Sequence, residues 1–289
     1  MNLLFQLVAS LVLAFFIALA ASQNSVEVNG VPLFGICAGV AFVVQWVIFI
    51  PSYIFQTEKF YDLTGSLTYL TIIGLGVTLS PADPQRLLLG VLVAIWACRL
   101  GLFLFMRIHK AGKDTRFDKK TNFMWFLFAW NTQGLWVVLT SAAALTCITS
   151  ATSVPISWLT YLGLTVWILG FTVEVISDRQ KSAFKAQPKN QGKFIQEGLW
   201  AYSRHPNYAG EIILWFGVAI IALPGLSGWQ YCTLISPVFV YLLLRYGSGV
   251  PLLEKQGLKR WGDLQAYQEY IAKTPILFPW VSPPRQAKD

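Results

Sequence analysis

Residues 3–21 read LLFQLVASLVLAFFIALAA and contain no charged side chain. A helix of that length measures about 28 Å at a rise of ~1.5 Å per residue, close to the ~30 Å hydrocarbon core of a bilayer. No Lys or Arg precedes the block, and Leu-Ala-Ala-Ser-Gln at 19–23 is a weak signal-peptidase site. We therefore interpret the block as a membrane helix that the mature protein retains.

Seven further apolar blocks of similar length follow and predict helices at 32–54, 63–80, 86–106, 122–149, 155–177, 205–223 and 229–249. Of the 289 residues, 55% are hydrophobic and only 12% are charged, about half the usual charged share. One soluble core could not bury so much apolar surface. The blocks are continuous rather than alternating, which excludes a closed β-barrel. The sequence predicts an all-α, multi-pass transmembrane bundle of about seven to eight helices.

The formal net charge of +8 is unevenly distributed along the chain. Most Lys and Arg residues fall in the loop 107–120, the loop 178–204 and the tail after residue 250. The alternating connections near 22–31, 81–85, 150–154 and 224–228 contain neither residue. The positive-inside rule then places the basic segments and both termini in the cytoplasm, beside anionic lipid. We expect an integral protein of a prokaryotic inner membrane or of the endoplasmic reticulum.

The sequence contains no pattern typical of several common classes of functional site. The four cysteines lie inside apolar blocks without CxxC spacing, and the only histidines are His109 and His205, so no metal site or disulfide framework is predicted. No phosphate loop, dinucleotide fingerprint or Ser/His/Asp arrangement occurs. The aromatic residues belong to hydrophobic helices, which disfavours nucleic-acid binding. Nothing indicates an obligate protein partner, or the repeats typical of a transporter, although a non-enzymatic transporter or lipid-binding scaffold remains a third possibility.

Residues 198–215, GLWAYSRHPNYAGEIILW, carry the densest polar set at membrane depth. Pro206 suits the first turn of a helix. From there Asn207, Glu211 and Trp215 recur at four-residue steps and should share one helix face. Ionisable groups at this depth are costly and therefore functional candidates, although a capped helix end with a structural Arg204–Glu211 pair is the simpler interpretation.

Two further polar sets flank this motif. Glu174 and Asp178 precede a group of basic residues, and the tail from 254 to 270 holds Trp261 and two tyrosines. A pocket built from the three sets would offer Lys and Arg to phosphates, aromatic rings to a planar base, and Asn and carboxylates to ribose or adenine. The sequence predicts cytoplasmic loops that bind a large anionic nucleotide cofactor.

The run YSRHPNYAGE at 202–211 resembles the steroid 5α-reductase C-terminal superfamily, which includes the sterol Δ14- and Δ7-reductases and bacterial membrane proteins with a related domain of unknown function. The resemblance extends from about 90 to 280 and includes Gly198-Leu-Trp and the tail pattern Trp261-Gly…Tyr270…Pro275…Pro279. It implies N-terminal helices at 1–85 that form part of a substrate chamber and a catalytic, cofactor-binding region at 86–289. Membrane isoprenylcysteine and phospholipid methyltransferases share an Arg-His-Pro-x-Tyr run.

In the reductases NADPH lies in a cytoplasm-facing pocket, and the resemblance implies the same cofactor here. Asn207 and Glu211 match the family's nucleotide-binding Asn and Glu, while Lys185 and Lys193 fall where the family has phosphate-facing Arg. The full set predicted to bind NADPH is Asp178, Lys181, Lys185, Lys193, Trp200, Tyr202, Arg204, His205, Asn207, Tyr208, Glu211, Glu254, Arg107 and Arg116.

The reductases use a Gln-Glu pair and a Tyr on N-terminal helices to polarise the substrate. The nearest match to the pair is Tyr61-Asp62, which we predict to be catalytic, and the family Tyr falls near Trp96. Asp62 could act as the acid if burial keeps its carboxyl protonated, since we expect it to have no near basic partner except Lys59. A structural helix N-cap is the competing interpretation of Asp62.

Together these patterns predict a membrane-embedded, NADPH-dependent oxidoreductase that acts on CH–CH groups. Its substrate would be a lipid-soluble, steroid-like or isoprenoid molecule with an activated C=C bond. The alternative is an S-adenosylmethionine-dependent methyltransferase of isoprenylcysteine or lipid groups. The many Lys and Arg residues favour the dinucleotide, which carries more phosphates than the cationic sulfonium ligand.

Overall fold

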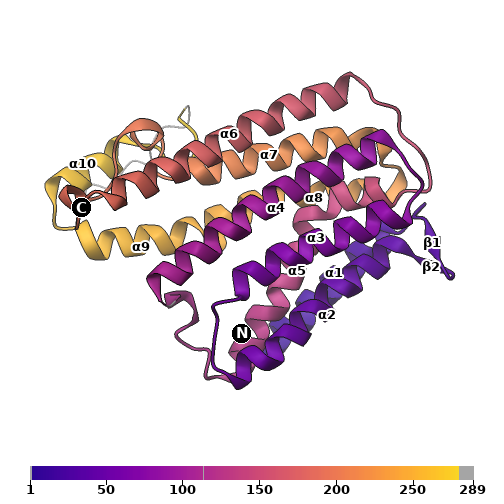
Figure 1. Cartoon of the computed structure of the whole chain (residues 1–289), viewed down its shortest axis with the longest axis horizontal. Coiled ribbons are helices and arrows are strands. Elements are labelled where there is room, and N and C mark those ends of the chain that lie inside the picture. The colour runs from indigo at the N-terminus through magenta and orange to yellow at the C-terminus, as the bar shows by residue number, and fades with distance from the viewer. Residues whose placement is uncertain (1, 113, 280–289) are drawn as a thin grey trace. The chain divides into compact units, whose positions relative to one another are not determined.

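The computed structural model describes residues 2–112 and 114–279 (Figure 1). Helices form almost all of its regular structure: α1 (Leu3–Ala21), α2 (Leu33–Ile54), α3 (Tyr61–Leu79), α4 (Pro84–Ala111), α5 (Phe123–Thr149), α6 (Trp158–Ala186), α7 (Pro206–Ala222), α8 (Ile235–Leu242), α9 (Val250–Trp261) and α10 (Gln265–Lys273). The strands β1 (Glu27–Val28) and β2 (Val31–Pro32) make one antiparallel hairpin. The predicted all-α class is confirmed.

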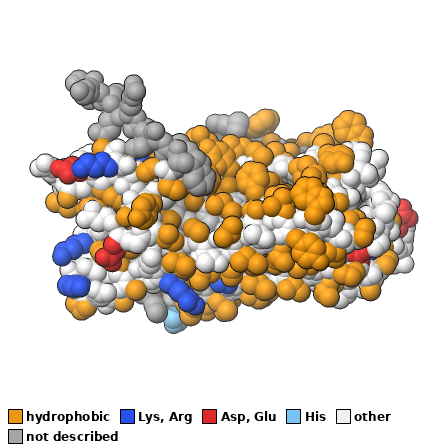
Figure 2. Space-filling view, turned by 90° about the horizontal axis from the view of Figure 1, so that it is seen from above, with side chains coloured by type: hydrophobic (Ala, Val, Ile, Leu, Met, Phe, Trp, Pro, Cys, Tyr) orange, Lys and Arg blue, Asp and Glu red, His pale blue; other side chains and the backbone are white. Residues whose placement is uncertain are grey.

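Eight helical segments of the described residues are long and apolar enough to cross a bilayer. Their bounds are Leu3–Ala21, Leu33–Ile54, Tyr61–Leu79, Pro84–His109, Phe123–Thr149, Trp158–Ala186, Pro206–Gly225 and Gly228–Trp261. On α1 almost nothing is buried, and Phe5, Phe15 and Phe16 are each at least 60% exposed. Hydrophobic side chains cover most of the face drawn in Figure 2. Such a surface is stable only against lipid, so the protein is an integral, multi-pass membrane protein.

Two predicted boundaries differ from the structure at polar helix ends. The block expected to end at residue 177 continues as α6 to Ala186, and the block expected to end at 106 continues as α4 to Ala111. Residues predicted as loop, including Arg107, Lys181 and Lys185, therefore lie on helices. A helix does not end where it leaves the hydrocarbon, because its backbone hydrogen bonds persist in water. The α6 helix ends just before Pro188, which cannot continue it.

The chain forms two compact units. Unit 1 comprises Met1–Tyr161 and Val218–Ser236, and unit 2 comprises Leu162–Gly217 and Pro237–Asp289. The predicted domain boundary at residue 85 falls at the start of α4, inside unit 1, and therefore does not coincide with the division between the units.

Helix α5 is the centre of unit 1, since 89% of its most apolar window is buried and α1 to α4 all pack on it. At its N-terminal end an aromatic core forms from Phe49, Tyr61, Phe117, Phe126 and Trp130. The Tyr61 ring lies edge-on to Trp130, with centroids 5.1 Å apart. Edge-to-face pairs of this kind add to the stabilisation that burial supplies.

At the other end of α5, the connections without Lys or Arg meet one another. Ala151 N donates to Asn24 O at 2.7 Å, and the side chain of Arg86 donates to Pro81 O and Thr152 O. Trp229 N donates to Gln23 Oε1 at 2.7 Å. The four connections that the charge pattern groups on one side of the membrane thus lie at one end of unit 1.

In unit 2 the helices α6 and α7 approach backbone to backbone, side by side in Figure 1. A Cβ on Gly170 would lie 2.4 Å from Leu214 N, and one on Gly210 would lie 2.6 Å from both Glu174 N and Gly170 O. Gly217 repeats this contact one heptad later against Gly163 O. Small residues at such spacing allow membrane helices to associate closely through van der Waals contact.

The last predicted block, 229–249, is not one regular helix. It consists of a 3-10 helix at Gly228–Leu234, then α8, then a π-helical turn at Leu243–Gly247. Gly249 separates this turn from α9, and a Cβ there would lie 2.5 Å from Leu244 O. The tail then folds into the short helices α9 and α10, which bring its aromatic and basic residues against the rest of unit 2.

Candidate functional site

Unit 2 contains a cavity of about 130 Å³, which we call the basic–aromatic pocket. Its walls come from the C-terminal end of α6, the segment 193–205, α9 and α10. The lining residues are Lys181, Phe184, Lys185, Lys193, Phe194, Ile195, Trp200, Arg204, His205, Leu253, Glu254, Gln256, Gly257, Arg260, Trp261, Tyr267 and Tyr270. Five of these side chains are Lys or Arg, and Glu254 is the only Asp or Glu among them. The pocket is therefore cationic with aromatic walls.

Glu254 binds two consecutive residues of the Arg-His-Pro-Asn-Tyr run. Its carboxylate is ion-paired with Arg204, and its Oε1 lies 2.8 Å from His205 Nε2. The Arg204 and His205 side chains are only 7% and 6% exposed, whereas that of Glu254 is 24% exposed. A buried guanidinium needs such a partner, because an unpaired charge out of water is strongly destabilising.

The surroundings of His205 favour its neutral imidazole. Burial lowers its pKa, with further lowering by the charges of Lys181 and Arg204, and these effects outweigh the hydrogen bond and the charge of Glu254. A neutral ring beside a carboxylate donates from Nε2–H, which leaves Nδ1 as an acceptor. His205 Nδ1, Arg204 Nε and Asn207 Oδ1 are buried without a hydrogen-bond partner among the described residues. Unsatisfied buried polar atoms of this kind suit a site that a ligand or water completes.

Backbone hydrogen bonds hold the Arg-His pair in place. Arg204 N donates to Pro275 O at 2.9 Å, and His205 N donates to Ile276 O at 3.1 Å. The Ser203 hydroxyl donates to Leu277 O at 2.6 Å. The segment after α10 thus lies along the residues that precede α7, and these hydrogen bonds hold the backbone from which the Arg204 and His205 side chains project.

Trp200 forms the aromatic floor of the pocket. Its indole N–H donates to Ser177 O at 3.0 Å, and the Tyr270 hydroxyl donates to Trp200 O at 2.7 Å. Lys181 Nζ lies 4.3 Å from the centre of the indole ring, within range of a cation–π interaction. Burial raises the pKa of Tyr270, so its hydroxyl remains a donor at physiological pH.

Two glycines permit close approaches, Gly257 in the lining of this pocket and Gly198 two residues before the lining residue Trp200. Gly198 has φ +60°, a conformation that disfavours other residues, and the Gln180 side chain fills the place of a Cβ there at 2.5 Å. The same Gln180 accepts a hydrogen bond from Leu199 N at 3.0 Å. A Cβ on Gly257 would lie 2.2 Å from the Tyr267 hydroxyl oxygen. The local backbone conformation therefore accounts for Gly198, while Trp200 of the same Gly198-Leu-Trp run lines the pocket.

Seven of the residues predicted to bind the cofactor line the pocket: Lys181, Lys185, Lys193, Trp200, Arg204, His205 and Glu254. The others do not belong to its lining: Asp178, Tyr202, Asn207, Tyr208 and Glu211 lie elsewhere in unit 2, and Arg107 and Arg116 lie in unit 1. Tyr202 is 67% exposed. A cofactor role for this second group stays a prediction.

The prediction missed several lining residues, notably Phe194, Arg260 and Gly257. The ring of Phe194 packs against Trp261, Tyr267 and Tyr270, with centroids 5.0–5.9 Å apart. The alternation of apolar and charged residues from 250 to 273 was an available signal, since it indicates short amphipathic helices. No pattern in the sequence indicated Phe194, because its place in the pocket depends on how the tail folds against it.

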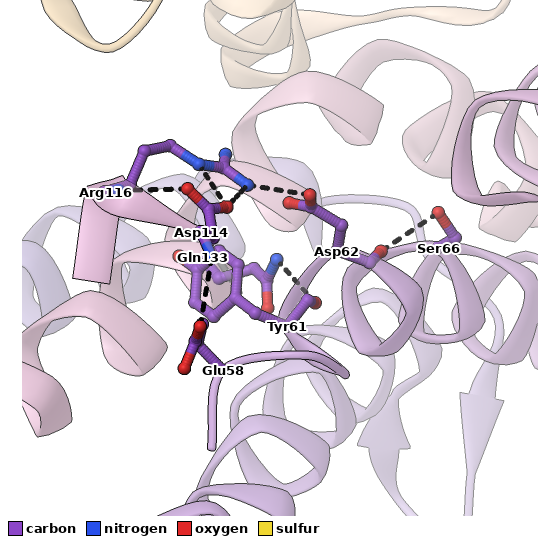
Figure 3. Close-up of polar contacts among 7 residues, drawn as sticks. All are labelled: Glu58, Tyr61, Asp62, Ser66, Asp114, Arg116 and Gln133. Atoms are coloured by element: carbon purple, nitrogen blue, oxygen red, sulfur yellow. Dashed lines mark hydrogen bonds and ion pairs between the residues drawn. The ribbon is translucent and has the colours of Figure 1, made fainter. Parts of the chain in front are cut away.

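Unit 1 holds a second polar site, the Arg116 cluster, formed by Glu58, Asp62, Asp114, Arg116 and Lys120 (Figure 3 shows all but Lys120). Arg116 Nη2 lies 2.7 Å from Asp62 Oδ2, and Arg116 Nε lies 2.7 Å from Asp114 Oδ2. Asp114 N donates to Glu58 Oε1 at 3.1 Å, and Lys120 is ion-paired with Glu58. The cluster fixes the α4–α5 connection against the start of α3.

The cluster stabilises the ionised forms of Glu58 and Asp114. Burial would raise the pKa of Glu58, but hydrogen bonds from Lys120 and from the Asp114 amide outweigh it, and the pKa is lowered. Burial likewise acts against ionised Asp114, yet the Arg116 guanidinium holds the pKa of that carboxyl below its usual value. Arg116 in turn has a raised pKa, because the charges of Asp62 and Asp114 outweigh the cost of its burial.

Two expectations about Asp62 are wrong. Helix α3 begins at Tyr61 with Phe60 at its cap position, so Asp62 lies in the first turn and is not the N-cap. Lys59 is not its only basic neighbour, because Arg116 forms an ion pair with it. Sequence could not show this partner, which is 54 positions away. The arrangement is that of a carboxylate, so an acid role would require Arg116 to be displaced.

The side chains of Tyr61 and Trp96 are both buried and packed within unit 1. The Tyr61 hydroxyl donates to Ala129 O at 2.9 Å, and Gln133 Nε2 donates to Tyr61 O at 3.1 Å. The Trp96 ring is buried edge-on to Tyr69, with centroids 5.1 Å apart. Among the described residues, no group of three or more His, Cys, Asp or Glu could hold a metal ion.

A family model described as "Protein of unknown function (DUF1295)" matches residues 45–274, from within α2 to the residue after α10. The chain belongs to the DUF1295 family. The DUF1295 match includes both the basic–aromatic pocket and the Arg116 cluster, so both sites lie in the region that the family model describes. No curated protein and no solved structure matches the chain.

Proposed function

We propose that this DUF1295 protein is an NADPH-dependent reductase of an activated C=C bond in a lipid-soluble, steroid-like or isoprenoid substrate. The observation that carries the proposal is the basic–aromatic pocket, in which five Lys or Arg side chains and six aromatic side chains surround one carboxylate. The resemblance of YSRHPNYAGE to the steroid 5α-reductase superfamily supports the same cofactor. Positive-inside topology supports a pocket on the cytoplasmic side, where NADPH is available.

The charge of the pocket favours a ligand with several phosphates. Glu254 is paired with Arg204 and His205, so it offsets little of the positive charge that Lys193 and Arg260 supply. Phosphate oxygens accept charge-assisted hydrogen bonds from such side chains. S-adenosylmethionine has no phosphate and carries a cationic sulfonium, which the same charges would repel. The methyltransferase alternative therefore fits the pocket less well.

The size of the pocket limits how much of the cofactor it can hold. Its volume of about 130 Å³ is below the ~300–1,000 Å³ of typical pockets for drug-sized ligands. In this form it accommodates a phosphate with part of an aromatic base rather than a whole dinucleotide. The unsatisfied His205 Nδ1 and Arg204 Nε are consistent with a site that a ligand completes.

In this proposal the residues of the chain have separate roles. Lys185, Lys193 and Arg260 bind phosphate, and Trp200 provides a flat surface for a ring. The Glu254–His205 hydrogen bond fixes the imidazole with Nδ1 as an acceptor for a ligand N–H or O–H. When bound, NADPH supplies the hydride for the substrate C=C bond. Asp62 of the Arg116 cluster is the candidate proton donor, in a state where Arg116 no longer pairs with it.

Thermal unfolding of the detergent-purified chain in titrations with NADPH, NADH and S-adenosylmethionine tests the proposal. A ligand that binds only the folded state raises the unfolding midpoint with its concentration. We expect NADPH to raise the midpoint at lower concentration than NADH. A rise with S-adenosylmethionine and none with NADPH would replace the reductase proposal by the methyltransferase alternative. No rise with any of them would refute a nucleotide site in this pocket.

A further inference from the structure

Unit 1 contains a second hollow, an apolar groove between the C-terminal half of α1 and the 3-10 helix Gly228–Leu234. Its volume is about 550 Å³, within the range of pockets that bind small molecules. Phe16, Ile17 and Ala20 line it from α1, while Trp229 and Cys232 line it from the other side. It is separate from both sites described above and almost wholly apolar.

The groove owes its shape to a small residue between larger ones. Phe16 and Ala20 are four residues apart, so they lie on one face of α1, and Gln23 follows just beyond the end of the helix. Ala20 is short, whereas Phe16 is 60% exposed and Trp229 is 72% exposed. A depression therefore runs along the helix between two large aromatic side chains.

The position of α1 sets the depth of the groove in the bilayer. The 19 residues of the helix match the hydrocarbon thickness, so Gln23, just beyond its end, lies at the level of the headgroups. Trp158 and Tyr161, at the start of α6, are exposed at the same end of unit 1, as interfacial aromatic residues are. From Phe16 to Gln23 the groove extends about 10 Å into the hydrocarbon, nearly parallel to the lipid chains.

The mouth of the groove offers hydrogen-bond donors. Gln23 Oε1 accepts from Trp229 N at 2.7 Å, which fixes the amide while its N–H₂ group keeps its donor capacity. The exposed Trp229 indole supplies another donor. The adjoining connections contain no Lys or Arg, and Glu27 is exposed there. The mouth therefore suits an ester carbonyl and offers no cation to an anionic headgroup.

We propose that this groove binds one acyl chain of a bilayer glycerophospholipid, with the ester carbonyl of that lipid at Gln23 and Trp229. The groove is continuous with the lipid-facing surface of α1, so a chain enters it sideways from the bilayer. Because the contacts are apolar and no Lys or Arg lies at the mouth, occupancy depends on the acyl chain and not on attraction of an anionic headgroup.

Native mass spectrometry of the full chain released from nanodiscs of mixed phosphatidylethanolamine and phosphatidylglycerol tests this site. We expect the chain to retain one phospholipid, without enrichment of phosphatidylglycerol over its bulk proportion. Ala20→Trp or Ile17→Trp fills the groove and should abolish retention. Val12→Trp is the matched control, because Val12 is 46% exposed on the same helix but does not line the groove, and it should retain the lipid.

A photoreactive-acyl phospholipid gives a second readout in the wild-type chain, independent of whether the filled variants fold. We expect its crosslinks on the peptides that contain Phe16–Gln23 and Gly228–Leu234. The proposal is overturned by wild-type retention in both filled variants, by crosslinks confined to other segments, or by enrichment of phosphatidylglycerol.

Discussion

Glu254 and His205 are joined by a 2.8 Å hydrogen bond between positions 49 residues apart, and the same carboxylate is ion-paired with Arg204. Through this contact α9 is connected to the residues that open α7. The strongest sequence motif of the chain and the helix α9 of its tail therefore form one site.

We expect Glu254→Gln to destabilise unit 2 by about 2 kcal/mol, because the nearly buried Arg204 loses its counter-charge while the amide oxygen still accepts from His205. Thermal unfolding without ligand measures this change. Glu269→Gln is the control, since Glu269 is exposed and 3.7 Å from Lys273, and such surface pairs contribute only ~0.3–0.5 kcal/mol. Equal effects of the two variants would show that the Glu254 pair is no stronger than a surface pair.

Lys185→Ala and Arg260→Ala should each weaken NADPH binding roughly tenfold, the effect of losing one charge-assisted hydrogen bond. The weakening should shrink as salt is added, because ions screen the attraction of exposed charges. Lys259→Ala is the control, since Lys259 is adjacent and exposed but does not line the pocket. Isothermal titration at two salt concentrations measures the affinities, and unchanged Kd values in both pocket variants would remove these residues from the phosphate site.

Gly210→Ala should destabilise the protein by about 1–3 kcal/mol, because its Cβ would meet backbone atoms of α6 that cannot move aside. Gly74→Ala on α3 is the control, since nothing lies within 4 Å of a Cβ there. Ala at an open helical position should be neutral or stabilising by up to ~1 kcal/mol. The unfolding midpoints of both variants in one detergent make the comparison, and a harmless Gly210→Ala would mean that α6 and α7 are not in backbone contact.

The Arg116 cluster should make stability depend on pH in acid. The pKa values of Glu58 and Asp114 are lowered in the folded state, so the stabilisation is complete above their unfolded values near ~4 and is lost as pH falls below them. Asp114→Asn removes one of these groups and should make the acid-induced loss of stability shallower. Unfolding midpoints between pH 6 and pH 3 measure the slope, for which the exposed Asp118→Asn is the control.

Sequence predicted the membrane helices well, because block length and lack of charge fix which segments can span a bilayer. The predicted block 3–21 is identical to α1, and 122–149 differs from α5 by one residue. Polar helix ends were harder to place, since Arg107, Lys181 and Lys185 resemble loop residues once they leave the hydrocarbon. Their charge indicated the membrane side and carried no information about where the helix ends.

The candidate site was predictable only where motif and charge coincide. Lys185, Arg204 and Glu254 could be proposed because each is a costly group near an apolar block. Phe194 and Gly257 could not, since their role depends on how the tail folds back. The pairing of Asp62 with Arg116 was equally hidden, because no pattern in the sequence specifies which cation reaches which carboxylate across a fold.

Asp62→Asn distinguishes a catalytic carboxyl from a structural one. The amide keeps an oxygen that can accept from Arg116, and Arg116 keeps its contacts to Asp114, so the fold should survive with a modest loss of stability. If Asp62 donates the proton after Arg116 moves away, turnover of an enone substrate should fall by ~10²–10⁴-fold with NADPH affinity unchanged. Single-turnover NADPH oxidation and unfolding midpoints on the same preparation separate the two effects. Full turnover in Asp62→Asn, with a lowered midpoint, would leave Asp62 as a structural partner of Arg116 and exclude it as the proton donor.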